Sequence, residues 1–295
     1  MTVEESPEYR LLCARALYAR QLLAKAGLCD SPRLMKAFSA VSREKFLGAP
    51  PWYFRDVGNY RELASADPAV LYQDLVVGLE TTRGINNGMP SLHASALHHI
   101  GIREGETVAH MGAGTGYYTA IIAQLVGPSG KVIAVEYDAV LADKAKRHLE
   151  DCPQVEVVHG SALEFPVDDA DVIYANFALD HPPRKWVDNL APGGRLVFPF
   201  GIPALEGDKS AGFSRWAAML KIDRWASGFG AKFLQPVSFI WGEGQEPAPE
   251  GRHERLAEAF RSRRLFQVRS FRWGQEATGG EWYGEDGWGL SFTEV

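Results

Sequence analysis

Apolar side chains recur at helical spacing in the first fifty residues. Between residues 11 and 23 they return every three or four positions, which predicts an amphipathic helix. These positions are Leu11, Leu12, Ala16, Tyr18, Ala19, Leu22 and Leu23. A second helix is expected within 29–46, because Asp30 or Ser31 can cap it and Pro32 suits its first turn. Two prolines within 47–56 then break the helical pattern, and the aromatic residues beside them predict a boundary between regions.

Residues 104–201 alternate apolar, strand-like runs with helix-like segments. Strands are predicted at 106–112, 131–138, 155–160, 169–177 and 195–201, and helices at 115–127, 139–151 and 183–194. The last of these helices is expected to end at a proline and two glycines. Strands and helices that alternate with short connections are typical of a doubly wound parallel sheet, so the predicted fold class is α/β.

Beyond residue 201 the pattern changes to longer strand-like runs. We expect a mixed or antiparallel extension with strands at 216–225, 231–242 and 266–273 and a helix at 252–263. The whole pattern predicts three regions. They are an N-terminal helical region with a linker over 1–72, an α/β domain over 73–201, and a C-terminal α+β extension over 202–295.

Charge is distributed unevenly within the C-terminal extension. Residues 251–272 hold seven Arg against two Glu, whereas 276–295 hold five acidic residues and no Lys or Arg. Two interpretations stay open: the acidic tail folds back onto a solvated helix, or the basic segment binds an anionic ligand. Trp282 and Trp288 of the tail are expected to pack on the protein's own surface; capping a pocket and pairing with a second subunit are the alternatives.

Composition excludes several classes of protein. A chain of 295 residues with 46% hydrophobic content can bury a large core, and its net charge of −6 argues against a general nucleic-acid surface. No stretch reaches the ~20 apolar residues of a membrane span, and the N-terminus is acidic where a signal peptide is basic. The three cysteines form no C-x-x-C pair, so we expect a cytoplasmic protein without a disulfide framework or metal site.

Three glycines follow the predicted strand at 106–112. Gly112, Gly114 and Gly116 give G-x-G-x-G, and the third glycine comes one residue too early for the dinucleotide fingerprint G-x-G-x-x-G. This spacing predicts a tight turn that a ligand can approach closely. The alternative is a turn that only shapes the backbone and binds no ligand. Glu136 ends the next strand, where a carboxylate can accept two ribose hydroxyls and repel a 2′-phosphate; a solvated Glu is the alternative.

At this point the chain resembles a known family. Three of its segments are similar to the successive motifs of class I S-adenosylmethionine-dependent methyltransferases, and more narrowly to those of protein-L-isoaspartate O-methyltransferases and their relatives. These segments are 108–138, 155–162 and 190–201. Residues 35–46 are similar to that family's N-terminal helix, and 84–97 to the loop ahead of its first motif. The resemblance covers about residues 20–201 and leaves the last ninety residues only loosely similar.

The resemblance implies a Rossmann-like methyltransferase domain over 73–201 with S-adenosylmethionine as its cofactor. The three glycines would wrap the amino-acid end of the cofactor, Glu136 would hold the ribose, and Ser161 and Ala162 would flank the adenine. Ser161 replaces an acidic residue that is usual in the family, so it can accept the adenine amino group without the charge. The further residues expected to bind the cofactor are Thr115, Tyr117, Tyr137 and Asn176.

The loop 84–90 departs from the family pattern. Its alignment places Gly88 where an isoaspartyl enzyme carries a Ser beside the transferred methyl group, and Asn86, Asn87 and Met89 replace small or hydroxyl residues. A glycine gives room for a bulkier acceptor, and the two Asn side chains offer amide donors and acceptors that can orient it. The alternative is that this segment is only a turn, in which Asn and Gly are common.

Two histidines are candidates for a general base. A carboxylate acceptor is ionised at pH 7 and needs no base, whereas a hydroxyl or amine acceptor benefits from one. His93 matches a His of some family members, and His181 follows the fourth predicted strand, where Asp180 is expected to contact the acceptor. A buried and merely hydrogen-bonded histidine is the alternative for both.

We therefore expect a methyltransferase of the isoaspartyl-like branch. The loop favours a non-isoaspartyl acceptor, namely a small metabolite, a natural product or a modified peptide. The alternatives are a genuine isoaspartyl repair enzyme, a cofactor-binding module without catalysis and, least favoured, an NAD-dependent oxidoreductase. Partners other than the acceptor are not predicted, and a homodimer stays open.

Overall fold

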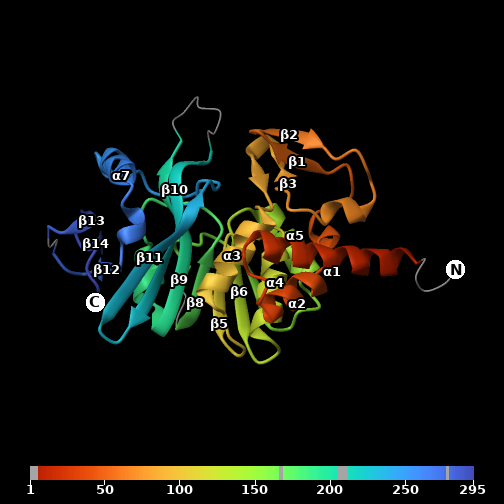
Figure 1. Cartoon of the computed structure of the whole chain (residues 1–295), viewed down its shortest axis with the longest axis horizontal. Coiled ribbons are helices and arrows are strands. Elements are labelled where there is room, and N and C mark those ends of the chain that lie inside the picture. The colour runs from red at the N-terminus through yellow and green to blue at the C-terminus, as the bar shows by residue number, and fades with distance from the viewer. Residues whose placement is uncertain (1–5, 166–168, 205–211, 277–278) are drawn as a thin grey trace. The chain divides into compact units, whose positions relative to one another are not determined.

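The computed structural model describes residues 6–165, 169–204, 212–276 and 279–295 (Figure 1). Contacts divide the chain into two compact units. The first comprises residues 1–106 and 113–159, and the second comprises 107–112 and 160–295. This division by contacts does not test the three regions expected from the sequence, which stay a prediction.

The first unit begins with the helices that the sequence predicts. Helix α1 (Pro7–Lys25) is capped by Ser6, whose hydroxyl accepts the N–H of Tyr9 at 3.1 Å. Only the second half of the predicted apolar stripe, from Tyr18 to Leu23, is buried, and Leu12 is 53% exposed. Helix α2 (Pro32–Ala40) has Pro32 in its first turn, but it ends six residues before Phe46, and a 3-10 turn η2 (Glu44–Phe46) follows. Helix α3 (Pro90–Ile100) occupies part of the segment 84–97.

Short hairpins lie between α2 and α3. Strands β1 (Tyr53–Asp56) and β2 (Asn59–Glu62) pair antiparallel, as do β3 (Gly78–Glu80) and β4 (Ile85–Asn86), with 3-10 turns η3 (Pro68–Leu71) and η4 (Thr81–Arg83) beside them. Arg43 stabilises this region because its buried guanidinium donates to the carbonyls of Leu71, Gln73 and Leu75 at 2.6–2.7 Å. The sequence pattern did not predict these hairpins.

The α/β part of the first unit follows the predicted alternation. Strands β6 (Lys131–Glu136) and β7 (Val155–His159) are parallel neighbours, and helices α4 (Tyr117–Val126) and α5 (Ala139–His148) connect this part of the chain. Asp138 caps α5 by accepting the N–H groups of Val140 and Leu141 at 2.9 and 3.0 Å. Strand β6 thus ends at Glu136, as expected.

The second unit joins parallel and antiparallel strands. Strands β5 (Thr107–Met111), β8 (Ala170–Ala175) and β9 (Leu190–Pro203) are parallel neighbours in that order. Strands β10 (Ser214–Trp225) and β11 (Gly228–Val237) continue from β9 in antiparallel register, and β12 (Ser270–Trp273), β14 (Trp288–Ser291) and β13 (Glu281–Glu285) follow (Figure 1). The mixed extension that the sequence predicts is therefore present.

Two local predictions in this unit need correction, and two strands were missed. Helix α6 (Arg184–Asp188) is shorter than predicted, because β9 begins at Leu190, which pairs with Ala170 and brings the proline and two glycines into the strand. Within 266–273 the chain forms a 3-10 turn η5 (Leu265–Gln267) before β12. Strands β13 and β14 were not predicted, since their glycines and charges hide the strand pattern.

Aromatic side chains form much of the core of the second unit. Phe200 of β9 lies 6.0 Å from the ring of Trp288 and 6.4 Å from that of Trp282, and Phe260 of helix α7 (Arg252–Arg261) lies 5.3 Å from Trp282. Trp282 and Trp288 are each 7% exposed. The expectation that these two tryptophans pack on the protein's own surface is confirmed.

Candidate functional site

The two ends of the glycine loop 112–116 have no room for a side chain. Gly112 follows β5 with φ of +78°, and a Cβ there would lie 2.8 Å from Cδ1 of Phe177. Gly116 precedes α4 with φ of +98°, and a Cβ there would lie 2.8 Å from Cδ1 of Leu149. Both the left-handed backbone and the close packing require glycine. The predicted tight turn is therefore present.

Glu136 is a buried carboxylate held by the backbone. One oxygen, Oε2, accepts the N–H of Gly114 at 2.7 Å, and Oε1 accepts the N–H of Asp138 at 2.9 Å. The residue is 8% exposed, and burial raises the pKa of Glu136 although these hydrogen bonds oppose the rise. Each oxygen keeps a lone pair for a further donor. Glu136 is thus no solvated strand end.

The other predicted cofactor residues of the first unit differ in their surroundings. Thr115 is buried and its hydroxyl donates to the carbonyl of Phe46 at 2.7 Å, while the hydroxyl of Tyr117 lies 3.3 Å from that of Tyr18. Tyr137 is 49% exposed. Thr115 and Tyr117 therefore use their side chains for packing inside the unit, and a role in binding would fall to their backbone.

In the loop before α3, Gly88 and His93 are in close contact. Asn86 shapes the turn, since its Oδ1 accepts the N–H of Gly88 at 2.9 Å. Gly88 has φ of +63°, and a Cβ there would lie 2.1 Å from Nε2 of His93. His93 is 2% exposed and its ring stacks on Tyr118 with 3.7 Å between centroids. The imidazole of His93 thus occupies the space that a side chain at position 88 would need.

Asn87 and Met89 flank Gly88 in different environments. Asn87 is 7% exposed, and its Nδ2 has no hydrogen-bond partner among the described residues. Met89 is 39% exposed and precedes the first turn of α3. A buried amide donor without a partner costs free energy unless a ligand or water satisfies it. Asn87 therefore fits the predicted role of a side chain that orients a ligand.

In the second unit, Asn176 follows β8 and contacts a buried histidine. Its N–H donates to the carbonyl of Met111 at 2.9 Å, and its Nδ2 lies 2.7 Å from Nε2 of His110. Burial lowers the pKa of His110 to about 3, so the ring is neutral and can accept this hydrogen bond. The buried Oδ1 of Asn176 has no hydrogen-bond partner within the described ranges. Asn176 thus offers an acceptor at the carboxyl end of a parallel strand.

Ser161 and Ala162 open the next connection of the second unit. The carbonyl of Ser161 accepts the N–H groups of Glu164 and Phe165 at 3.2 and 3.0 Å, which forms a turn. The carbonyl of Ala162 accepts the indole N–H of Trp186 at 2.9 Å. These contacts fix the backbone of the segment expected to flank the adenine.

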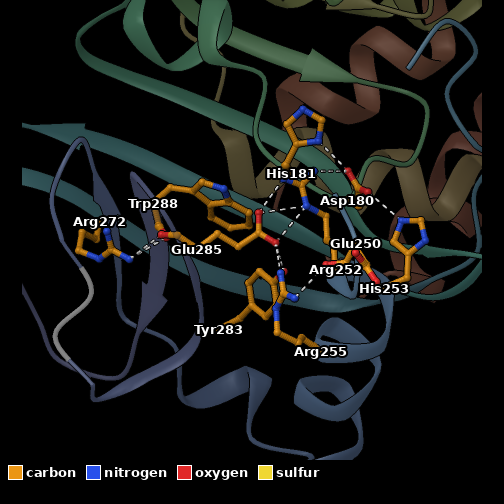
Figure 2. Close-up of polar contacts among 10 residues, drawn as sticks. All are labelled: Asp180, His181, Glu250, Arg252, His253, Arg255, Arg272, Tyr283, Glu285 and Trp288. Carbon is orange, nitrogen blue, oxygen red and sulfur yellow. Dashed lines mark hydrogen bonds and ion pairs between the residues drawn. The ribbon is translucent and has the colours of Figure 1, made fainter. Parts of the chain in front are cut away.

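Asp180 is the centre of a cluster of side chains in the second unit (Figure 2). Its Oδ1 accepts a hydrogen bond from Nδ1 of His181 at 2.6 Å, and its Oδ2 accepts one from Nε2 of His253 at 2.8 Å. Arg252 adds a third contact at 3.3 Å. Burial alone would raise the pKa of Asp180, but the bonds from the two histidines and the charge of Arg252 hold that pKa well below its usual range.

Arg252 connects Asp180 with a second carboxylate. Glu285 of β13 accepts hydrogen bonds from Arg252 at 2.6 Å, from Arg255 at 2.9 Å and from the hydroxyl of Tyr283 at 2.6 Å (Figure 2). Burial opposes the effect, yet Arg252 and Tyr283 lower the pKa of Glu285. The acidic tail thus folds back onto the basic helix α7. This confirms the first interpretation of the uneven charge for Arg252 and Arg255.

Only indirect signs of this cluster are present in the sequence. Asp180 and His181 were predicted as site residues from their place after a strand. His253, Arg252 and Glu285 were missed as individual residues, although the Arg-rich segment and the acidic tail indicated that opposite charges would meet. His110 was missed too, and its signal was a polar residue inside an apolar strand. The roles of all predicted site residues stay predictions.

Comparison with known proteins places the chain in a family. A model of the protein-L-isoaspartate(D-aspartate) O-methyltransferase family matches residues 19–211, which is more than half of the chain. The chain belongs to this family. The predicted resemblance is thereby confirmed, and so is the methyltransferase class at the level of the family. The cluster residues Arg252, His253 and Glu285 lie beyond the matched segment.

Curated relatives carry the same family name. A protein-L-isoaspartate O-methyltransferase of Aeropyrum pernix is 34% identical over 189 residues, which cover 62% of this chain and 66% of the relative. One of Thermotoga maritima is 29% identical over 192 residues, covering 61% of this chain and 54% of the relative. The chain thus spans about half to two thirds of the length of these relatives.

Solved structures share the fold. A protein-L-isoaspartate O-methyltransferase superposes with a TM-score of 0.60 at 23% identity, over 88% of this chain and 73% of that one. A putative member from Plasmodium falciparum, in complex with S-adenosyl-L-homocysteine, superposes with a TM-score of 0.59 at 17% identity, over 78% of this chain and 99% of that one. The predicted Rossmann-like α/β fold is therefore confirmed. Over the described residues no helix is long and apolar enough to cross a membrane.

Proposed function

We propose that the chain transfers a methyl group from S-adenosylmethionine to a carboxylate acceptor, and that an L-isoaspartyl residue is that acceptor. The observation that carries the cofactor assignment is the buried carboxylate of Glu136, bonded to the N–H of Gly114 at the end of β6. A carboxylate in this place accepts ribose hydroxyls and repels a 2′-phosphate. The cofactor, when bound, supplies an electrophilic methyl group on a sulfonium.

The first unit presents a group that fits such a ligand. Glu136 retains lone pairs for hydroxyl donors. The second unit, taken by itself, holds an acceptor for an ammonium or amine N–H in the unpartnered Oδ1 of Asn176. The chain's own work in the reaction is to bind, to align and to exclude water, because in-line displacement by an ionised carboxylate needs no base.

The family name and the names of the relatives support the isoaspartyl acceptor. They favour this alternative over the non-isoaspartyl acceptor that the loop 84–90 led us to expect. The proposal includes the cytoplasmic location expected from the sequence. It leaves the homodimer as an expectation that light scattering of the purified chain would test.

One observation favours a second candidate, in which the acceptor is a small metabolite, natural product or modified peptide. Gly88 stands where the isoaspartyl family carries Ser, and Nε2 of His93 lies where a side chain at 88 would begin. The methyl acceptor would then meet an imidazole and the amide of Asn87 instead of a hydroxyl. A Gly88→Ser variant cannot restore the hydroxyl without displacing His93, so it does not separate the two candidates.

The deciding experiment measures labelled methyl transfer from S-adenosylmethionine to an isoaspartyl peptide, with the aspartyl peptide of the same sequence as control. Binding of S-adenosylhomocysteine is measured by calorimetry on the same sample. Transfer to the isoaspartyl peptide alone supports the first candidate. Cofactor binding without transfer overturns it in favour of the second or of a module without catalysis, and absence of cofactor binding overturns both.

A further inference from the structure

The hairpin formed by β3 and β4 packs against the glycine loop inside the first unit. A Cβ on Gly114 would lie 3.5 Å from Cδ1 of Leu79, so the side chain of Leu79 in β3 lies directly against this glycine. The N–H of Gly114 is the group that bonds to the carboxylate of Glu136. The hairpin, the glycine at 114 and Glu136 all belong to the first unit. One end of the hairpin thus covers the backbone beside the ribose carboxylate.

Arg83 connects the turn of the same hairpin to the residues after β6. It lies in η4, between β3 and β4, and its Nη1 donates a hydrogen bond to Oδ2 of Asp138 within an ion pair. The side chain of Asp138 is 17% exposed and that of Arg83 is 43% exposed. The hydrogen bond from Arg83 is the main cause that holds the pKa of Asp138 below its usual value. The hairpin is therefore fastened at its turn by a charged contact.

Asp138 links this contact to Glu136. Its N–H donates to Oε1 of Glu136 at 2.9 Å, and its Oδ1 caps α5. Arg83 bonds to the other oxygen, Oδ2, so the cap and the ion pair do not compete for one atom. The guanidinium also offsets the negative charge of Asp138, which stands beside the carboxylate that is to accept the ribose. Arg83 thus acts on the cofactor site through Asp138.

The hairpin is too short to hold its position by strand pairing alone. Strands β3 and β4 are three and two residues long, and two-stranded hairpins are marginally stable in water. Two further bonds support it: the hydroxyl of Tyr60 donates to the carbonyl of Gly84 at 3.1 Å, and the N–H of Asn87 donates to the carbonyl of Val77 at 2.8 Å. A short segment with such sparse bonding opens more readily than the sheet beneath it.

We propose that Arg83 is a positioning residue for the cofactor, which holds the hairpin closed over the glycine loop between Gly114 and Asp138. The ion pair of Arg83 with Asp138 breaks when S-adenosylmethionine enters and when S-adenosylhomocysteine leaves. This inference rests on the proposed function, because it takes Glu136 as the acceptor of the ribose hydroxyls. The pair controls how fast the cofactor exchanges, since opening of the hairpin uncovers the backbone beside that carboxylate.

The test measures how fast the full chain releases labelled S-adenosylhomocysteine when excess unlabelled compound is added. Arg83→Gln should raise the dissociation rate about three- to fivefold, which is the range for a partly exposed ion pair. Arg83→Lys keeps the positive charge, so its rate should lie between those of the wild type and Arg83→Gln. Arg61→Gln is the matched control, because Arg61 pairs with Asp56 at 2.8 Å in the neighbouring hairpin of the same unit.

Two further measurements separate the ion pair from a general loss of structure. Raising the salt concentration from about 0.05 M to about 0.5 M should speed release from the wild type and leave release from Arg83→Gln unchanged, because salt screens a partly exposed pair. Amide hydrogens of residues 78–87 should exchange faster in Arg83→Gln than in the wild type, whereas those of β1 and β2 should not change. A dissociation rate that is equal in the wild type and Arg83→Gln overturns the inference, as does an equal increase in Arg61→Gln.

The outcomes distinguish this inference from the proposed function. Release that depends on the charge at position 83, without methyl transfer to the isoaspartyl peptide, leaves the hairpin contact standing and overturns the proposed reaction. Methyl transfer with the same release rate in the wild type and both variants at position 83 leaves the reaction standing and overturns the inference. A wild type that does not bind S-adenosylhomocysteine overturns both.

Discussion

Glu136 in the first unit and Asp180 in the second are both buried carboxylates near strand ends, yet they have opposite surroundings. Backbone N–H groups of Gly114 and Asp138 bind Glu136, whose pKa is raised mainly by burial. Two histidines and an arginine bind Asp180, whose pKa is lowered despite its burial. Neutral donors leave the charge of Glu136 available to a ligand, whereas the guanidinium of Arg252 and two imidazoles bind Asp180 and make it a structural centre.

The largest expected effect comes from removing the centre of the cluster. Asp180→Ala leaves Arg252 and two histidines without their shared acceptor, so the free energy of unfolding should fall by about 3–5 kcal/mol, as for other broken buried ion pairs. Urea denaturation measures this. A loss below 1 kcal/mol would show that Asp180 is not the structural centre that its contacts indicate.

A smaller effect on a different observable is expected at Glu136. Glu136→Ala should weaken S-adenosylhomocysteine binding by about 1–3 kcal/mol, because it removes a charged acceptor of ribose hydroxyls. Calorimetry measures the affinity, and Glu150→Ala, an exposed glutamate, is the control. Equal affinities in the two variants would remove Glu136 from the cofactor site.

Removing the charge of Glu285 should lower the free energy of unfolding less than removing Asp180 does. Arg252 keeps Asp180 as a partner when Glu285→Gln removes the second charge, so the expected loss of stability is about 1–2 kcal/mol. The same denaturation experiment measures it. A loss as large as that of Asp180→Ala would show that the second carboxylate, and not the first, holds α7 in place.

The smallest effect is a contrast in pH dependence. The lowered pKa of Asp180 contributes stability that is present above the unfolded value of about 4 and is lost as pH falls through the folded value. The raised pKa of Glu136 works in the opposite sense, because its contribution is present at low pH and is lost as pH rises from the unfolded to the folded value.

Two variants make this contrast measurable. The stability gap between the wild type and Asp180→Asn should narrow on acidification below about pH 4. The wild type should lose stability relative to Glu136→Gln as pH rises above about 4.5. Thermal unfolding between pH 2 and 7 records both gaps, and gaps that change in the same direction would contradict the comparison.

The local sequence pattern was sufficient to predict most of the glycine loop and the position of Glu136. The apolar run of β5 and the glycines after it predicted the turn, and the alternation that follows placed Glu136 at the end of β6. Thr115 and Tyr117 show where pattern stops being sufficient. Their positions in the motif were predicted, but their side chains contact Phe46 and Tyr18, which lie far away in the sequence.

The cluster around Asp180 depends on contacts between residues far apart in the sequence, which a local pattern cannot predict. Asp180 meets His253, 73 residues away, because α7 packs on β9 and β13, and β13 joins the sheet through β14 and β12. The tail's own strands went unrecognised because glycines and charges interrupt their apolar alternation. Likewise, the length of α6 was wrong because the pairing of Leu190 with Ala170 overrides the local preference for helix.

The family, the α/β alternation, the glycine turn and the place of Glu136 could be predicted from the sequence, because each of them depends on residues close together in the chain. Only the packed fold shows that His93 occupies the space beside Gly88 and that Asp180 binds two histidines and an arginine. Those features depend on distances between side chains from separate elements, and only the packed fold specifies such distances.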